Sequence, residues 1–250
     1  VVTLERLLQA EGLGSRRECR GWIMAGAVSV NQQPVTDPQQ TFPRDGSLLS
    51  FNNEQWFSQT KLTVLLHKPA GVECSHNPSH HPPVHQLLPI RLRQRGLQCV
   101  GRLDQDTTGL LLLTDHGPLQ ARIADPQHKL PKTYWVQVDG IPNELQLGQL
   151  RRGVDLGDFV SATAKVKLID EPFDLWERNP PIRMRKNLPT SWLEISICEG
   201  KNRQVRRMTA KVGLPTLRLV RAMIGSVALG DLKPGQWQEM SYAEFIQKLN

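Results

Sequence analysis

The sequence predicts an α+β protein that consists of a small N-terminal unit and a larger core with a mixed, largely antiparallel sheet. Helix and strand patterns alternate irregularly beyond residue 62, and several strand candidates are apolar on one side only. No G-x-G-x-x-G segment and no P-loop accompanies them, which disfavours the nucleotide-cofactor folds. The 250 residues suffice for a small domain and a medium one. We therefore predict domains at residues 1–51 and 62–250, joined by a linker at 52–61.

The N-terminal unit is predicted to contain two helices and two strands. Leucines at positions 4, 7 and 8 have helical spacing, and the glycines at 12 and 14 end this first helix. Ser15-Arg-Arg-Glu18 is a capping box that begins a second helix, which Gly26 ends. Residues 28–30 and 47–51 alternate as strands, and the polar stretch that follows is typical of a linker.

The core is predicted to hold five strands and four helices. Alternation is clearest near residue 195, where leucine and isoleucine side chains face one way and polar ones the other. The apolar run Leu110 to Leu113 is interpreted as a buried strand. The predicted strands are 63–66, 110–113, 132–138, 161–169 and 192–198, and the predicted helices are 118–124, 143–152, 202–212 and 242–249.

Charge is distributed unevenly along the chain. The net charge is +7, but residues 1–60 carry five arginines and six acids, so the excess of positive charge lies entirely beyond residue 60. A basic protein is attracted to polyanions, because each phosphate that it neutralises releases counterions. The core is therefore the better candidate for contact with nucleic acid.

Cysteine usage and hydropathy bear on the compartment. The four cysteines lie far apart and form no CxxC pair, which favours reduced thiols over a disulfide scaffold or a zinc site. No apolar run approaches the roughly 20 residues needed to cross a bilayer. The first residues lack the pattern of a secretory signal. We expect a cytoplasmic protein that does not contact a membrane.

One loop is a candidate for chemistry. Gly101-Arg-Leu-Asp104-Gln-Asp-Thr-Thr-Gly109 is polar, has glycine at both ends and precedes the buried strand at 110–113, so it can present side chains at a sheet edge. A carboxylate there could act as a nucleophile or as an acid and base if a cation keeps it ionised. Residue types alone favour a cap or a surface group for Asp104, and the neighbouring segments decide otherwise.

Several short segments, in order, resemble the motifs of the RsuA-type bacterial rRNA pseudouridine synthases. The helix–turn–helix–strand pattern at the start is similar to the S4 RNA-binding domain, so the resemblance covers nearly the whole chain. The matching segments are His67-Lys-Pro-Ala-Gly71, Gly101-Arg-Leu-Asp104, Lys132-Thr-Tyr134, Glu199-Gly-Lys-Asn-Arg-Gln-Val-Arg-Arg-Met208 and Leu219-Val-Arg-Ala-Met-Ile-Gly225.

This resemblance implies three catalytic residues. Asp104 aligns with the essential aspartate that attacks the uridine, either on the pyrimidine ring or on the anomeric carbon of the ribose. Tyr134 aligns with the tyrosine that stacks on the base and assists proton removal from carbon 5. Arg206 aligns with the basic residue that pairs with the aspartate and holds it ionised. On residue types alone, Tyr134 could equally be a core aromatic and Arg206 part of a solvated basic face.

The resemblance also implies binding residues. Leu219 aligns with the leucine that lines the base pocket, and Arg102, beside the nucleophile, is a candidate phosphate contact. Arg203 is expected to share a helix face with Arg206. The remaining candidates are Lys132 and Arg207 for the substrate, and Arg16, Arg17 and Arg20 on the second helix of the S4-like unit for RNA. A small helical cap that does not touch RNA is the alternative for that unit.

No cofactor and no metal are expected. The reaction of the family exchanges bonds within one nucleotide and needs neither a redox agent nor an energy source. Histidines 76, 80, 81 and 85 crowd one stretch, and imidazole suits zinc, but the prolines at 78, 82 and 83 indicate an ordinary loop.

The RNA substrate is predicted to be 23S rRNA, and the protein is predicted to be a monomer. Residues 172–192 are long, basic and aromatic, which suits phosphate contact and base stacking, and they resemble the RluE branch of the family. The S4-like start instead resembles the small-subunit branch, so 16S rRNA is the alternative. Two other functions remain: a non-catalytic rRNA-binding or ribosome-assembly factor, and a hydrolase that uses Asp104 and Asp106 as a carboxylate pair.

Overall fold

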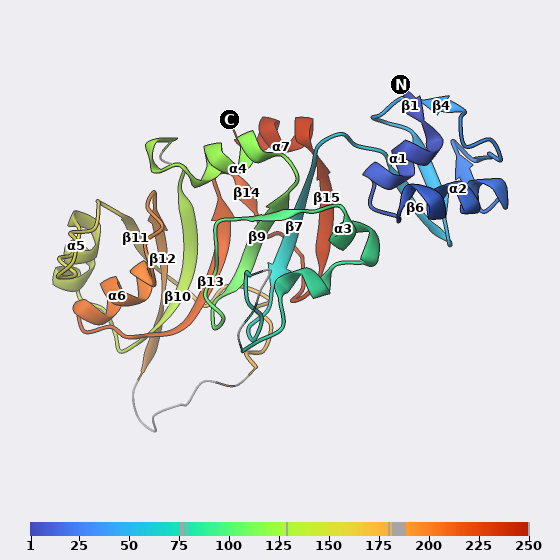
Figure 1. The fold of residues 1–250 in the computed structure, drawn as a ribbon. Helices are drawn as coiled ribbons and strands as arrows, with labels where there is room; N and C mark the ends of the chain where they lie inside the picture. Colours follow the sequence, from blue (N-terminus) through green and yellow to red (C-terminus); the bar gives the residue numbers. More distant parts are fainter. Residues whose placement is uncertain (76–77, 79, 129, 180, 182–188, 250) are drawn as a thin grey trace.

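In the computed structural model, the chain forms a small N-terminal unit beside a larger core built on one twisted sheet (Figure 1). The structure describes residues 1–75, 78, 80–128, 130–179, 181 and 189–249. The predicted α+β class is confirmed, because helices cover a sheet that is mostly antiparallel. None of the helices in the described part of the chain is long and apolar enough to cross a membrane.

The N-terminal unit packs two helices against a four-stranded sheet of order β3-β2-β5-β6. The predicted capping box is present: Ser15 accepts from the backbone N–H of Glu18, and the Glu18 carboxylate accepts from Ser15. A two-stranded ribbon, β1 with β4, closes the other side of the unit. Its elements are β1 (Val2–Thr3), α1 (Leu4–Ala10), α2 (Arg16–Met24), β2 (Val28–Val30), β3 (Gln33–Pro34), β4 (Thr41–Phe42), β5 (Leu48–Phe51) and β6 (Glu54–Phe57).

The predicted linker at residues 52–61 contains one of these strands. Residues 54–57 form β6 and pair with β5 in antiparallel register, with Trp56 opposite Leu49. Asn52 and Asn53 adopt left-handed backbone with φ of 49° and 63°, which suits a two-residue hairpin turn. Trp56 is 7% exposed and joins the core of the unit, so its burial outweighs the polar composition that suggested a linker.

The core sheet has nine strands, and its main path runs β11-β12-β10-β13-β9-β7-β15. Strand β8 adds to β9 and β14 adds to β13. Among the residues that the structure describes, every strand pairing of this sheet is antiparallel except that of β13 with β9, so the sheet is mixed as predicted. The strands are β7 (Leu62–Lys68), β8 (Gln98–Val100), β9 (Thr108–Thr114), β10 (Lys132–Asp139), β11 (Lys165–Ile169), β12 (Thr190–Ile197), β13 (Thr216–Ile224), β14 (Val227–Ala228) and β15 (Trp237–Ser241).

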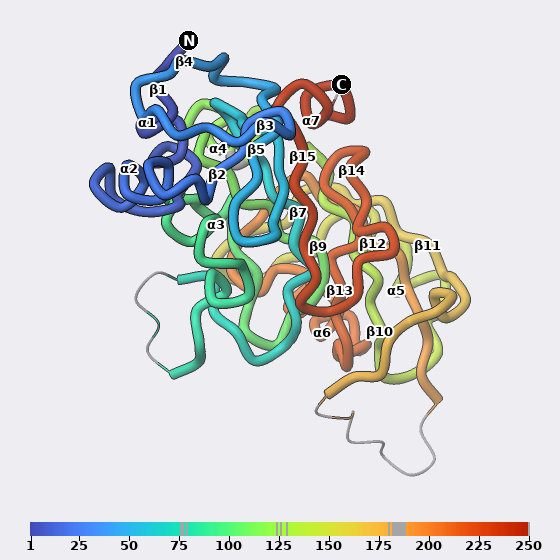
Figure 2. The backbone as a smooth tube through the Cα atoms, turned by 90° about the vertical axis from the view of Figure 1, so that its right-hand side faces the viewer, coloured from blue at the N-terminus to red at the C-terminus, as the bar shows by residue number. Residues whose placement is uncertain are grey.

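Helices cover both faces of this sheet. Strand β9 is buried throughout, and its leucines alternate between two core clusters. Leu111 and Leu113 belong to the cluster that includes residues of α3, α5 and α6, and Leu110 and Leu112 belong to the cluster that includes residues of α4 and α7. The predicted buried strand is thereby confirmed. Figure 2 shows the backbone turned by 90°, with α1 and α2 of the N-terminal unit next to α3. The helices are α3 (Ile90–Gln94), α4 (Gly117–Ala124), α5 (Glu144–Arg152), α6 (Gln204–Lys211) and α7 (Tyr242–Leu249), with short 3₁₀ turns at Val84–Leu87 and Pro126–His128.

Strand β11 is shorter than the predicted strand at residues 161–169. The Ser161 side chain accepts from the backbone N–H of Val154 at 2.9 Å, and its own N–H donates to the Val154 carbonyl at 2.9 Å. These bonds fold residues 154–161 back on themselves behind α5, so the ladder with β12 begins only at Lys165.

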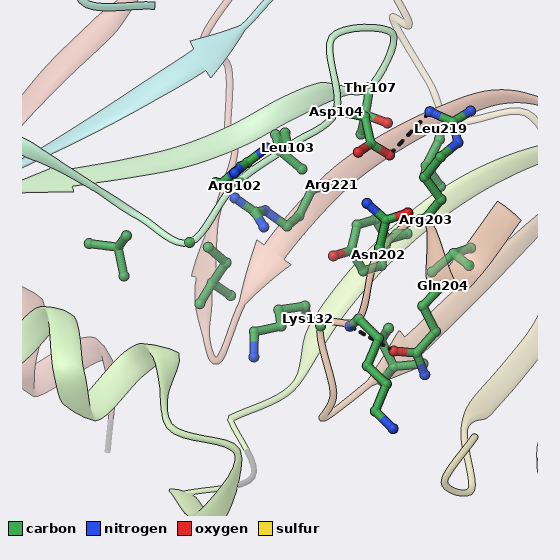
Figure 3. A pocket seen from close by; sticks show the side chains of 18 of the residues that line it. Arg102, Leu103, Asp104, Thr107, Lys132, Asn202, Arg203, Gln204, Leu219 and Arg221 are labelled. Atoms are coloured by element: carbon green, nitrogen blue, oxygen red, sulfur yellow. Dashed lines mark hydrogen bonds and ion pairs between the residues drawn. The ribbon is translucent and has the colours of Figure 1, made fainter. Parts of the chain in front are cut away.

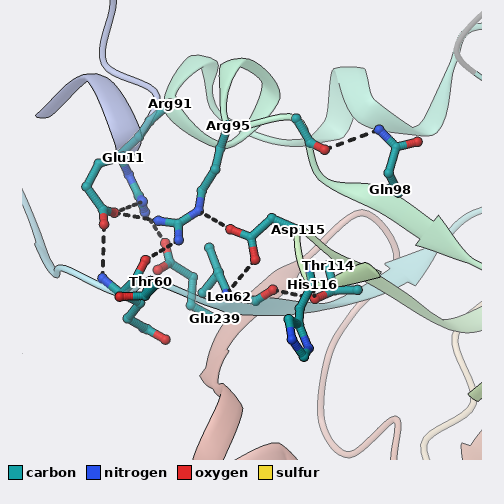
Figure 4. A network of polar contacts seen from close by, with 12 residues as sticks. Glu11, Thr60, Leu62, Arg91, Arg95, Gln98, Thr114, Asp115, His116 and Glu239 are labelled. Carbon is teal, nitrogen blue, oxygen red and sulfur yellow. Dashed lines mark hydrogen bonds and ion pairs between the residues drawn. The ribbon is translucent and has the colours of Figure 1, made fainter. Parts of the chain in front are cut away.

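The two units of the chain are joined by a buried network of charged side chains (Figure 4). Glu11, at the end of α1, accepts from Arg95 of the core at 2.7 Å and from the backbone N–H of Gln59 at 2.9 Å. Arg95 also donates to Asp115 at 2.7 Å, and Arg91 lies 3.6 Å from Glu11. Burial raises the pKa of Glu11, and the two guanidinium groups act against this effect. Because these groups are desolvated together, their separation would leave buried charges without partners.

Backbone contact reinforces the network. Gly12 has φ of 81°, and a Cβ there would lie 2.2 Å from the carbonyl oxygen of Arg91. Only glycine permits this approach of the N-terminal unit to α3. The Arg91 guanidinium stacks 4.7 Å from the Trp56 ring and pairs with Glu239 of β15. The N-terminal unit is therefore fixed to the core at an interface of buried ion pairs and close backbone contact.

Candidate active site

The loop that carries Asp104 opens into a cavity of about 450 Å³ beside the central strands. The loop leaves β8 and returns as β9, and the cavity lies between it, the start of β10, the segment before α6 and strand β13. The Asp104 side chain is 32% exposed, so a substrate can reach it. Figure 3 shows Asp104 and Arg203 at one side of this cavity and Lys132 at another.

A buried lysine holds the loop in place. Lys68 ends β7 and is fully buried, and its ammonium donates to the carbonyls of Pro69 at 3.0 Å, Gln105 at 3.2 Å and Thr107 at 2.9 Å. Two of these acceptors flank the loop carboxylates in sequence. Burial lowers the pKa of Lys68 to about 8, although nearby carboxylates and a thiol favour its charged form. Three carbonyls around one ammonium satisfy its donors, which makes such burial tolerable.

Gly109 sets where the loop rejoins the sheet. Its φ is 106°, and a Cβ at this position would lie 2.4 Å from the carbonyl oxygen of Arg221. The parallel pairing of β9 with β13 begins here, with Arg221 opposite Gly109 and Val220 opposite Thr108. This close crossing brings Leu219 of β13 to the wall of the cavity.

In this structure the direct ion pairs of the loop carboxylates differ from the predicted pair of Asp104 with Arg206, although the charge of Asp104 still acts on Arg206. Asp104 pairs with Arg203 at 3.4 Å, whereas Arg206 pairs with Asp106 at 3.2 Å. Arg203 also donates to Asp106 from two nitrogens at 3.2 and 3.3 Å. Among the residues that the structure describes, Arg206 forms no ion pair with Asp104.

The backbone of Arg203 explains this exchange. Arg203 has φ of 47°, in the left-handed region, and caps a helix that begins only at Gln204. Arg203 is therefore outside the helix. A helix that began at residue 202 would have placed Arg203 and Arg206 on one face, and that expectation is wrong. The Arg203 side chain reaches both loop carboxylates, whereas Arg206 is one turn deeper and only 11% exposed. A left-handed non-glycine residue costs free energy and is typical of functional sites.

The charges of this cluster perturb one another. Burial acts to raise the pKa of Asp106, but the guanidinium groups of Arg203 and Arg206 outweigh it and leave that pKa below its usual value. Burial lowers the pKa of Arg206, whereas the hydrogen bonds that Arg203 donates to Asp106 raise the pKa of Arg203. Burial also lowers the pKa of Lys132, with a contribution from the charge of Arg221.

The cavity gathers most of the predicted substrate residues. Asp104, Arg102, Lys132, Arg203 and Leu219 all line it, and so does one aromatic residue, Tyr134. Tyr134 lies on β10 between β12 and β13, opposite Ile195 and Arg221. It is 8% exposed and belongs to the core cluster, so its ring is held rigidly while one part faces the cavity.

Arg207 does not fit its predicted role in substrate binding. Its guanidinium pairs with Asp158, donates to the carbonyl of Leu156 at 3.1 Å and stacks on Phe159 at 5.3 Å. It is absent from the cavity wall. Since Arg207 follows Arg206 on α6, it projects from a different side of the helix, toward the loop behind α5.

The candidate arginines of the N-terminal unit are all exposed on α2. Arg16 and Arg20 share one buried partner, Glu5, with Arg16 Nε at 2.7 Å and Arg20 Nε at 3.6 Å from its carboxylate oxygens. Glu5 therefore offsets part of the positive charge of this helix, while Arg17 remains exposed. The three residues keep their assignment as an RNA-contact proposal.

The structure also bears on the alternatives. No group of three or more metal-ligating side chains occurs in the described ranges, which include histidines 80, 81 and 85 but not His76. The four cysteines are free thiols. The Asp104 and Asp106 side chains line two different cavities, and both contact the same nitrogen of Arg203, at 3.4 and 3.2 Å. Of the predicted basic segment, residues 180 and 182–188 lie outside the described residues.

Three residues of the site had no predicted role in the synthase reaction. Lys68 anchors the loop, Asp106 pairs with both arginines, and Arg221 lines the cavity while its Nε donates to the carbonyl of Leu110 at 2.7 Å. Each lies within or beside a motif quoted above. A charged residue inside an otherwise apolar strand segment was the available signal for Lys68 and Arg221.

Comparisons with known proteins identify the family of the chain. Residues 62–211 match the sequence model of the RNA pseudouridylate synthase family, and residues 2–44 match that of the S4 domain. The ribosomal large subunit pseudouridine synthase E of Xanthomonas campestris is 52% identical over 177 residues, covering 71% of this chain and 94% of that protein. The protein of the same name from Vibrio parahaemolyticus is 58% identical over 146 residues. This match covers 58% of this chain and 61% of that protein.

Two further relatives extend over the N-terminal unit. The ribosomal large subunit pseudouridine synthase B of Salmonella typhi is 34% identical over 250 residues, covering 96% of this chain and 80% of that protein. A crystal structure of a pseudouridylate synthase has a TM-score of 0.63 and 27% identity, and covers 100% of both chains. The family match, the full-length relative and the loop with its aspartate together show that this chain belongs to the RNA pseudouridylate synthase family.

Proposed function

We propose that the protein converts a specific uridine of 23S rRNA into pseudouridine, with Asp104 as the nucleophile. The observation that carries this proposal is the cavity itself, in which Asp104, Tyr134 and Leu219 meet. Five cationic side chains line the same cavity: Arg102, Lys132, Lys201, Arg203 and Arg221. A carboxylate surrounded by cations suits a reaction at the base of a polyanionic substrate.

The choice of 23S rRNA is supported by relatives that match part of the chain and by one that matches nearly all of it. Relatives that are 52% and 58% identical are named as large-subunit synthases of type E, and one that matches 96% of the chain is named as a large-subunit synthase of type B. An N-terminal S4 domain is therefore compatible with a large-subunit substrate. It does not require the 16S alternative.

In the proposed reaction, the bond between N1 of uracil and the anomeric carbon breaks, and a bond from C5 to that carbon replaces it. The base must detach, rotate and rejoin the same ribose, while C5 loses a proton and N1 gains one. An Asp104 oxygen attacks either the ring or the anomeric carbon and is released when the new bond has formed. The overall change is an isomerisation, so no oxidant or external group enters the balance.

The neighbouring charges would prepare Asp104 for this attack. Arg203 pairs with it directly, and Arg206 contributes its charge from behind Asp106. Arg206 also lies 3.4 Å from the carbonyl of Asp106, so together with Lys68 it fixes the loop from a second side. A loop held in this way need not reorganise as charge develops in the transition state.

The remaining cavity residues would bind the base and its backbone. Tyr134 offers a ring face for stacking and a hydroxyl for the proton at C5, and Leu219 gives an apolar wall. Arg102 and Lys132 would contact the phosphates on either side of an extruded uridine. We further propose that residues 62–250 form the catalytic domain, that Arg16, Arg17 and Arg20 contact RNA from the S4-like domain, and that the protein is a cytoplasmic monomer.

Pseudouridine mapping tests this function. Unmodified 23S and 16S rRNA transcripts are incubated with the wild type or with Asp104→Asn, and carbodiimide treatment followed by primer extension locates pseudouridine. We expect one new stop in 23S rRNA with the wild type and none with the variant. A stop in 16S rRNA alone would show that 16S rRNA, and not 23S rRNA, is the substrate. Tight binding without any stop would favour a non-catalytic rRNA-binding factor.

A further inference from the structure

A second cavity of about 270 Å³ lies next to the catalytic cavity. The two share Leu219, and each receives one carboxylate of the catalytic loop: Asp104 lines the first and Asp106 the second. The lining of the second cavity includes Asp106, Trp176, Glu177, Arg178, Arg218 and Leu219. The second cavity is therefore within reach of a nucleotide next to one whose base lies against Asp104.

One wall of the cavity is an indole that is already fixed. The Trp176 ring packs edge-on against His67, with centroids 4.2 Å apart and an angle of 76° between the planes. The Arg218 guanidinium lies 5.0 Å from the same ring and donates to the Trp176 carbonyl at 2.6 Å. Arg218 is 8% exposed, so the wall is built from buried parts and needs no reordering to receive a ligand.

The charge of the cavity favours a phosphate-bearing ligand. Arg178 and Arg218 line it, and of the two lining acids Asp106 is already paired with Arg203 and Arg206. In the described part of the chain, no hydrogen bond or ion pair engages the Arg178 guanidinium. Its charge acts on two neighbouring arginines, Arg206 and Arg218, whose pKa values are lowered mainly by burial and further by Arg178.

The size of the cavity narrows the ligand further. Sites for drug-sized molecules begin at ~300 Å³, so this volume suits one planar ring rather than a whole nucleoside. An indole wall suits a nucleobase, because every base presents a π-face or an edge to an aromatic ring. The free guanidinium at the rim is placed for the phosphate that such a base carries with it.

We propose that this cavity binds the base of a nucleotide that neighbours the target uridine on the same strand. The base packs against Trp176, and its phosphate pairs with Arg178. The protein thus reads an extruded neighbour together with the uridine, with Asp104 and Asp106 between them. This inference rests on the proposed function, since it assumes that the catalytic cavity receives a uridine of an RNA strand.

Abasic substitution in the RNA tests the base contact. The probe is a short synthetic RNA centred on the uridine that mapping identifies, with an abasic nucleotide placed in turn at each flanking position. Wild-type protein is expected to lose about 5- to 150-fold in kcat/KM at one flanking position, which is the effect of one base–aromatic contact. In Trp176→Ala, the same abasic RNA should lose less than about threefold further, because the contact is already absent.

The phosphate contact has a separate readout. Arg178→Ala should weaken binding of the unsubstituted RNA and lower the slope of log affinity against log salt concentration by about 1. Arg152→Ala, an exposed arginine at the end of α5 and outside both cavities, is the matched control and should keep the wild-type slope. Arg178→Lys should restore the slope, because it restores the charge.

The possible results are distinguishable. Wild-type turnover with equal tolerance of an abasic nucleotide at every flanking position overturns the inference and leaves the proposed function standing. Full additivity of Trp176→Ala with the sensitive abasic position overturns it as well. If Trp176→Ala does not fold, the abasic scan with the wild type and the salt slope of Arg178→Ala decide. Absence of wild-type turnover on the unsubstituted RNA overturns the function and the inference together.

Discussion

Replacement of Lys68 by methionine tests how the catalytic loop is held. The change keeps the length of the side chain but removes an ammonium that donates to three carbonyls, two of them in the loop at Gln105 and Thr107. Each carbonyl left buried without a donor costs about 1–3 kcal/mol. The substitution also removes the cost of burying the charge of the ammonium, which offsets part of this loss. At roughly 1.36 kcal/mol per pKa unit, the lowering of the Lys68 pKa from 10.5 to about 8 corresponds to about 3 kcal/mol.

Three such carbonyls cost about 3–9 kcal/mol. After the relief of about 3 kcal/mol, we expect Lys68→Met to lower the free energy of unfolding at pH 7 by roughly 0–6 kcal/mol, with about 3 kcal/mol at the centre of this range. Urea denaturation followed by circular dichroism measures it, and Lys165→Met, an exposed lysine on β11, is the control, with an expected change of less than about 0.5 kcal/mol. The variant should retain measurable turnover, because Lys68 positions the loop and does not touch the substrate. Its kcat/KM should fall less than that of Asp104→Asn.

The pH dependence gives the sign of the effect. Because the pKa of Lys68 is lower in the folded state, the unfolded chain binds more protons between pH 8 and 10.5. The wild type should therefore gain stability relative to Lys68→Met across this range, by up to about 3 kcal/mol. A stability difference that stays constant from pH 7 to 10 would refute this account of the loop.

Three further substitutions test other parts of the structure. Gly12→Ala should destabilise the protein by at least about 2 kcal/mol more than Gly46→Ala in urea denaturation, because both glycines have φ of 81° but only a Cβ at position 12 would collide with Arg91; equal effects would contradict the close backbone contact at this interface. Tyr134→Phe should lower kcat in tritium release from 5-tritiated uridine RNA by about 10²–10⁴-fold with little change in KM, since it keeps the ring and removes the hydroxyl; an unchanged kcat would remove the hydroxyl from the mechanism. Arg207→Ala should stay within about threefold of the wild-type kcat/KM, because its guanidinium is engaged away from the cavity; a loss of 100-fold or more would return it to the substrate site.

The elements of the core could be predicted because local patterns decide them. The leucines at 110–113 belong to a strand buried on both faces, and the run Tyr242–Leu249 forms a helix over the residues that its spacing indicated. The capping box at Ser15 needs only four consecutive residues. Such features depend on neighbours in sequence, so tertiary contacts leave them unchanged.

The pairing of charges in the site could not be predicted in the same way. A helical pattern continues back to residue 202, and nothing in it indicates that Arg203 adopts left-handed backbone and leaves the helix. The bonds of Lys68 likewise join positions 37 and 39 residues apart, and Glu11 contacts an arginine 84 residues away. These partners are chosen by how the sheet and the two units pack, which no local pattern contains.

The motifs located the site because each is a continuous segment of the sequence. The ion-pair partners within the site come from segments far apart in the chain. Asp104, Tyr134 and Leu219 were predicted one by one from three segments, and the structure brings all three to one cavity. Asp106 was considered only as half of a carboxylate pair, and its place between the two cavities became visible once the loop geometry was known.

The central claim is that Asp104 makes this protein a pseudouridine synthase of 23S rRNA. The most direct measurement maps pseudouridine in total rRNA from cells that lack the protein, after complementation with the wild type or with Asp104→Asn. The account predicts one pseudouridine in 23S rRNA that is missing in the deletion, returns with the wild type and stays missing with folded Asp104→Asn. Restoration of that pseudouridine by Asp104→Asn, or an unchanged map after the deletion, would contradict it.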